Sequence, residues 1–214
     1  MLTLERAVQP DGRAVLVWRA AAPVRALATT VLGGGLGPRS WIVNAEVGID
    51  YDHDDPGVHV ASIAARLGLD AHHGGVGFLT AARVLDVEST NDDDATCDAT
   101  VGISTPTWAA APDGEWSRWR PGTINLVCWV PAPLSDAALA NALVTATEAK
   151  TQALFEAGVP GTGTASDAVA ICCPPGGTEP YGGPRSTWGA RLARAVHESV
   201  ATGTARFLAT GFSS

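Results

Sequence analysis

A series of short apolar or β-branched runs, each bounded by Gly, Pro or Asp, constrains the fold of this chain more than any other feature. Runs of this kind predict strands, because extended backbone accommodates branched side chains and the bounding residues favour turns. The first two flank the turn sequence Gln9-Pro10-Asp11-Gly12, so we expect the chain to open with a β-hairpin. The predicted strands are residues 2–8, 13–18, 27–32, 41–47, 76–80, 83–88, 100–104, 124–130 and 168–172.

Three other segments have helical periodicity and helix end signals. Residues 56–67 follow an Asp55-Pro56 start, residues 135–157 run from an N-cap serine, Ser135, to Gly158, and residues 187–201 are expected to stop at Gly203. The strands are grouped rather than alternating with helices, there is no internal repeat, and no linker divides the chain. We therefore predict a single α+β domain over residues 1–214, with a mostly antiparallel or mixed sheet of about eight strands and about three helices packed on it.

Composition excludes several classes of protein. The 214 residues carry a net charge of −8, with 13 Arg and one Lys that form no basic stripe, so we expect no nucleic-acid partner. No run approaches a membrane span of about 18 apolar residues, and the N-terminus has no signal-peptide pattern, so we expect a cytoplasmic protein without a membrane partner. The four cysteines lack C-x-x-C spacing, which predicts reduced thiols and no zinc site.

The single lysine, Lys150, occupies an unusual position on its predicted helix. It falls on an apolar stripe that spans about 80° of the helical wheel, whereas Glu148 points roughly 160° away on the polar face. A lysine on such a stripe must reach solvent or find a partner, because a buried unpaired ammonium is costly. The alternatives are a structural lysine whose stem reaches the edge of the stripe, or a functional base or cation. The stripe consists of Leu139, Leu143, Ala146, Lys150 and Leu154.

Glycine and hydroxyl residues cluster in three places. Such loops allow close approach of backbone N–H groups to a ligand and add short donors and acceptors, although for Gly33–Gly35 alone an ordinary turn is the better explanation. The cluster that ends in Asp167 just before a predicted strand is the best candidate for a site. The clusters are Gly33-Gly34-Gly35, Gly122-Thr123-Ile124-Asn125 and Gly161-Thr162-Gly163-Thr164-Ala165-Ser166-Asp167.

Two further features have competing interpretations. The acidic run Asp50-Tyr51-Asp52-His53-Asp54-Asp55, with His72-His73 beyond it, could supply metal ligands. Its spacing matches no ligand pattern, and Asp54 and Asp55 suit a helix N-terminus, so we predict no metal site. A tryptophan-rich loop at residues 106–121 could stack on a large flat ligand or pack on the core.

Several strings together resemble the adenosylcobinamide amidohydrolases of corrinoid salvage, in the same order from about Gly33 to Val200. Two departures from the family pattern stand out: Ala165-Ser166 replaces Gly-Thr, and Arg185-Ser186 replaces His-Thr. The strings are Gly77-Phe78-Leu79-Thr80-Ala81-Ala82, Ala99-Thr100-Val101-Gly102-Ile103-Ser104, Gly122-Thr123-Ile124-Asn125, Thr147-Glu148-Ala149-Lys150-Thr151 and Thr162-Gly163-Thr164-Ala165-Ser166-Asp167-Ala168-Val169.

The resemblance implies hydrolysis of the amide that joins a corrin propionate to aminopropanol in adenosylcobinamide or its phosphate, giving adenosylcobyric acid. The cobalt corrinoid would be the small-molecule substrate and not a cofactor, and a homo-oligomer is compatible with the sequence. The alternatives are a non-catalytic corrinoid-binding protein and a metal-dependent hydrolase acting on another amide.

The resemblance also implies roles for named residues, because amide hydrolysis needs a base, an oxyanion donor and a proton for the leaving amine. Asp167 or Glu148 is the expected base, Lys150 supplies charge or a proton, and a threonine nucleophile is an alternative. The expected substrate-binding residues are Gly33, Gly34, Asn44, Thr80, Thr123, Asn125, Thr164 and Ser166.

Overall fold

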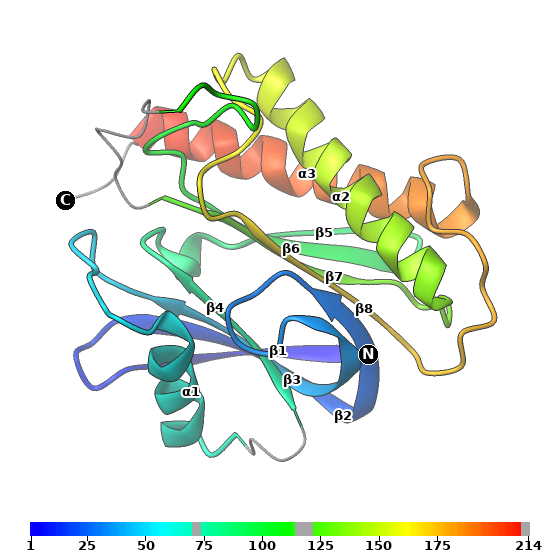
Figure 1. Cartoon of the computed structure of the whole chain (residues 1–214), viewed down its shortest axis with the longest axis horizontal. Coiled ribbons are helices and arrows are strands. Elements are labelled where there is room, and N and C mark those ends of the chain that lie inside the picture. The colour runs from blue at the N-terminus through cyan, green and yellow to red at the C-terminus, as the bar shows by residue number, and fades with distance from the viewer. Residues whose placement is uncertain (70–73, 114–121, 211–214) are drawn as a thin grey trace.

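In the computed structural model, which describes residues 1–69, 74–113 and 122–210, the described strands form one mixed sheet (Figure 1). The order is β4-β3-β2-β8-β7-β6-β5, and β1 pairs with the first part of β2. The β3–β4 and β7–β8 pairs are parallel, and the other pairs are antiparallel. The strands are β1 (Leu2–Val8), β2 (Ala14–Ala28), β3 (Gly35–Glu46), β4 (Gly75–Thr80), β5 (Glu88–Asp92), β6 (Ala95–Val101), β7 (Ile124–Trp129) and β8 (Ala168–Cys173).

Strand β2 lets the sheet fold over on itself. Its first part pairs with β1, its last four residues pair with β8, and the register against β3 shifts between Arg19 and Val24. One face of β2–β4 therefore packs on one face of β7–β8, with Ile42 and Phe78 on one side and Val127 and Ala170 on the other. This contact forms the inner apolar layer of the molecule.

Helices cover the two outer faces of the folded sheet (Figure 1). The helix α1 (Pro56–Arg66) lies on β3 and β4, where Val60 and Ile63 are buried. The helices α2 (Asp136–Glu156) and α3 (Thr187–Thr210) lie side by side over β5–β8. The described residues thus form a single α+β unit of four layers: one helix, two layers of strands, and a pair of helices. The α+β class agrees with the prediction from the sequence.

The helix starts agree with the sequence prediction. The Ser135 side chain accepts a hydrogen bond from the Ala138 N–H, and the Asp55 side chain accepts one from the Val58 N–H. Because α2 packs both on β-strands and on α3, Thr145 is buried, and its hydroxyl donates to the Gly182 carbonyl at 3.1 Å.

Several predicted elements differ. The separate strands expected at 13–18 and 27–32 are one strand, β2, which ends at Ala28. The strand expected at 83–88 is a 3-10 turn, Val84–Asp86, because its residues leave one sheet layer and enter the other. The strand expected at 100–104 lies earlier, as β6, in a hairpin with β5 that turns at Asp93 and Asp94, both with positive φ. Helix α3 continues past Gly203, which is buried against β6.

Cys97, Cys128, Cys172 and Cys173 are all buried free thiols, and burial raises the pKa of Cys172 to about 12. None of the described helices combines the length and apolar character that crossing a bilayer requires.

Candidate functional site

A cleft of about 410 Å³ opens where the two strand layers separate. Its lining comes from both layers: from the segment after β2, from the ends of β3 and β4, from the segment before α1, and from the loops that lead into β7 and β8. The lining residues are Thr29, Thr30, Val31, Val47, Tyr51, Pro56, Gly77, Phe78, Leu79, Thr80, Ala81, Gly122, Thr123, Asn125, Ser166, Asp167 and Ala168.

Asp167 is the sole carboxylate among these lining residues, and both of its oxygens are held. Oδ1 accepts from the Ile124 N–H at 2.9 Å and from the Thr164 hydroxyl at 2.6 Å. Oδ2 accepts from the Thr164 N–H at 3.1 Å and from Lys150 Nζ at 2.5 Å. Four donors from three segments therefore fix the orientation of the carboxylate at the cleft wall.

The order of elements explains why these groups meet. Parallel pairing of β7 with β8 sets Asn125 opposite Ala168, so Asp167 lies beside Ile124 at the same end of the sheet. Helix α2 is the crossover between these two strands, and Lys150 lies toward its C-terminal end. The Lys150 side chain is 7% exposed and does not line the cleft, so its charge reaches the cleft through Asp167.

Gly163 closes the space around this ion pair. A Cβ atom built on Gly163 would collide with both Asp167 Oδ2 and Lys150 Nζ. The backbone of the loop thus lies directly against the two charged groups and covers one side of the ion pair. The electrostatic interaction of a buried ion pair is stronger than that of an exposed one. Removing either partner leaves the other charge buried and uncompensated.

A buried polar network lies beneath the cleft floor and joins the two strand layers. The Asn125 side chain donates to Asn44 Oδ1 at 3.1 Å and to the Leu79 carbonyl at 3.2 Å. Asn44 in turn donates to the Thr100 hydroxyl at 2.9 Å, and Thr123 Oγ1 lies 3.2 Å from Asn125 Oδ1 and 2.9 Å from the Ser166 carbonyl. Both N–H groups of the Asn125 side chain have acceptors within the protein, so Asn125 holds the floor of the cleft in place.

Comparison with known proteins decides the family of the chain. The sequence profile of the adenosylcobinamide amidohydrolases matches residues 2–210. A Methanosarcina mazei protein named adenosylcobinamide amidohydrolase is 30% identical over 185 residues, which are 82% of this chain and 88% of that protein. A Halobacterium salinarum protein of the same name is 44% identical over 109 residues. The chain belongs to the adenosylcobinamide amidohydrolase family. The Halobacterium match spans 48% of this chain and 46% of that protein, about half of each.

Membership of this family places the chain among the amide hydrolases, as the sequence predicted. Most of the residues expected at the site lie together in the structure. Thr80, Thr123, Asn125, Ser166 and Asp167 line the cleft. Three more contact these residues from behind, namely Asn44, Lys150 and Thr164.

Three predicted site residues lie elsewhere. Glu148 is exposed on the outer side of α2, on the face opposite to Lys150, so it is not part of the cleft. Gly33 and Gly34 form the turn between β2 and β3, outside the cleft lining. Gly33 has a φ of +67°, and a Cβ there would collide with the Gly75 carbonyl, so close backbone packing accounts for this glycine.

Sequence reasoning missed the part of the lining that precedes α1 and follows β2. Tyr51 lies inside the acidic run that the sequence suggested as metal ligands, and Thr29 to Val31 carry no motif. The available signal was an aromatic residue between Asp50 and Asp52, shortly before the helix that Asp55 caps, but only the folding of one layer onto the other shows that it faces the cleft.

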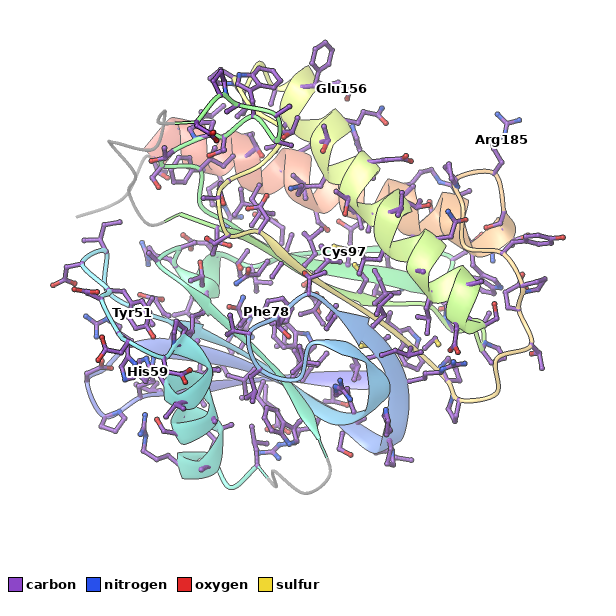
Figure 2. All side chains as sticks on the ribbon, in the orientation of Figure 1. Tyr51, His59, Phe78, Cys97, Glu156 and Arg185 are labelled. Carbon is purple, nitrogen blue, oxygen red and sulfur yellow. The ribbon has the colours of Figure 1, made fainter. Side chains whose placement is uncertain are left out.

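Among the residues that the structure describes, the remaining features do not line the cleft. Arg185, where the family pattern has His, is exposed on the loop before α3 and points to solvent, far from Tyr51 and Phe78 (Figure 2). That departure therefore gives no support to a non-catalytic binding protein. The described residues hold no group of three His, Cys, Asp or Glu arranged for a metal. His72, His73, Trp116 and Trp119 lie outside the described residues.

Proposed function

We propose that this protein hydrolyses the amide between a corrin propionate and aminopropanol in adenosylcobinamide, or in its phosphate, to give adenosylcobyric acid and the free amine. The observation that carries this proposal is Asp167, the one carboxylate among the described cleft residues, held by a buried lysine in a chain of this family. The cobalt enters with the substrate, and no resident cofactor takes part in the proposal.

Asp167 acts as the base and then as the acid. It removes a proton from a water molecule as the water oxygen bonds to the amide carbon, and it gives that proton to the amine nitrogen as the C–N bond breaks. Because all four acceptor positions are filled in the structure, the Thr164 hydroxyl, which is free to rotate, yields its position to the water. The cleft-lining hydroxyl of Ser166, which is 3.5 Å from its acceptor, the Gly122 carbonyl, is the proposed donor to the developing oxyanion.

Lys150 is a positioning residue in this scheme. It contacts Asp167 and does not line the cleft, so it holds the carboxylate in the orientation that faces the water. A guanidinium is planar and larger than an ammonium and would press on Gly163, which explains a lysine here in a chain whose other basic residues are all arginine.

The deciding experiment is incubation of the protein with adenosylcobinamide and with its phosphate, followed by mass-spectrometric detection of adenosylcobyric acid and of the released amine. We expect Asp167→Asn to lower kcat by about 100-fold or more, in line with the usual contribution of a general base. Lys150→Met should lower kcat and shift its pH profile, whereas Glu148→Gln, on the opposite face of α2, serves as the matched control with near-normal turnover.

Folding must be checked separately, because removal of one partner of a buried ion pair destabilises a protein by about 3–5 kcal/mol. Circular dichroism and equilibrium dialysis of the corrinoid show whether each variant is folded and still binds. Binding of adenosylcobinamide by the wild-type protein without release of the amine would overturn the proposal in favour of a binding protein. Normal rates in folded Asp167→Asn would overturn the role of Asp167.

A further inference from the structure

Three nearly parallel aromatic rings lie on the α1 side of the cleft. Tyr51 and His59 have ring centroids 5.5 Å apart and planes 16° apart, and His53 lies 4.9 Å from His59 with planes 7° apart. Figure 2 shows Tyr51 and His59 at the start of α1. Of the three, Tyr51 lines the cleft, and both histidine rings are stacked against it. The proposed hydrolysis makes no use of this group.

The Tyr51 ring is fixed in place by several contacts. Its hydroxyl lies 3.0 Å from His59 Nδ1, and its backbone N–H donates to the Gly48 carbonyl at 3.1 Å. Partial burial raises the pKa of Tyr51 and lowers the pKa of His59, so burial favours the uncharged form of both rings. The helix that carries His59 is capped by Asp55, two residues after His53. A ring that is held before a ligand arrives loses little entropy on binding.

Apolar residues flank the Tyr51 ring in the cleft lining. Val31, which is 64% exposed, and Pro56 line the cleft together with Tyr51, so the ring has apolar neighbours that a planar group can contact at the same time. Aromatic rings bind other flat rings in offset-stacked or edge-to-face geometry, and nucleobases stack on tyrosine without regard to hydrogen-bonding pattern. The chemistry of this end of the cleft therefore fits a heteroaromatic ring.

This inference rests on the proposed function, because the substrate of that reaction supplies such a ring. The two faces of a corrin macrocycle are blocked by axial ligands and side-chain amides, whereas the adenine of an adenosyl ligand is flat and uncovered. A cleft of about 410 Å³ is too small to enclose the whole macrocycle, so the groups that enter it must be peripheral ones. We propose that Tyr51, supported by His59 and His53, stacks on the adenine of the substrate and makes the protein selective for the adenosylated corrinoid.

The test compares adenosylcobinamide with cyanocobinamide, in the dark so that the cobalt–carbon bond survives. For the wild-type protein we expect a higher kcat/KM and tighter binding for the adenosyl compound. Tyr51→Ala should lower the adenosyl-to-cyano ratio about tenfold, the size expected for loss of one stacked base. Tyr51→Phe keeps the ring and should keep most of the ratio. Tyr181→Ala, at an exposed tyrosine on the loop before α3, is the matched control.

The outcomes separate this inference from the proposed function. Equal treatment of both corrinoids by the wild-type protein, or an equal loss for both in Tyr51→Ala, would overturn selectivity by stacking. A loss in Tyr51→Phe as large as in Tyr51→Ala would also overturn it, because the phenol and not the ring would then matter. If the wild-type protein hydrolyses neither compound, the proposed function fails, and the binding ratio measured by equilibrium dialysis still decides the role of Tyr51.

Discussion

Around Lys150 and Asp167, a single glycine decides whether two charges can meet. The pair is buried, its atoms are 2.5 Å apart, and Gly163 lies against both side chains. A methyl group at this position has nowhere to go, because the neighbouring atoms belong to an ion pair that four hydrogen bonds already restrain. The geometry of the site therefore depends on the missing Cβ atom of Gly163 as much as on the two charged groups.

Gly163→Ala should therefore push Lys150 and Asp167 apart. We expect the free energy of unfolding to fall by about 1–3 kcal/mol, as for other overpacked sites, and kcat to fall together with it. Urea denaturation and the amide-release assay measure the two effects. Gly158→Ala is the matched control: Gly158 has a φ of +73° and open space around it, so it should cost about 1 kcal/mol of strain without any change in kcat. Unchanged turnover in folded Gly163→Ala would contradict this account.

Among the elements, the sequence predicted those whose signals are local. Ser135 and Asp55 cap the helices at which they were expected, because an N-cap depends on the next three residues only. The hairpin turn at Asp93 and Asp94 was missed, because aspartate enters the left-handed region less often than glycine or asparagine. The end expected at Gly203 was wrong, because the contact that requires this glycine comes from a distant strand.

Gly203 shows how tertiary packing overrides helix propensity. A Cβ there would lie 2.6 Å from Val101 Cγ2 and 3.6 Å from Glu88 Cγ, so the glycine lets α3 approach β6 and β5 closely. Gly203→Ala should destabilise the protein by about 1–3 kcal/mol by overpacking, although alanine favours an isolated helix by about 1 kcal/mol. Urea denaturation against Glu198→Ala, at an exposed position of the same helix, measures the difference. Stabilisation by Gly203→Ala would contradict this packing.

At the scale of the whole molecule, two halves repeat one pattern of pairing. β1–β2–β3–α1–β4 and β5–β6–β7–α2–β8 each contain two antiparallel pairs, a crossover helix and a parallel pair, although no repeat is visible in the sequence. The cleft lies between the halves. The sequence could predict Asp167 and Tyr51 as members of local motifs but not that both line this cleft, because that depends on how β2 folds one half over the other.

The Asn44–Asn125 contact tests this arrangement, because it joins residues 81 positions apart, one from each half. Both side chains are buried, so each single change to alanine removes their shared hydrogen bond, leaves Asn44 Oδ1 or one Asn125 N–H without that partner, and should cost about 1–3 kcal/mol. The double variant should cost less than the sum of the two by about 0.5–3 kcal/mol. Asn44→Ala combined with Ser199→Ala, whose hydroxyl bonds the Cys97 carbonyl under α3, should be additive. Additive costs for Asn44 and Asn125 in urea denaturation would show that the two halves do not meet at these residues.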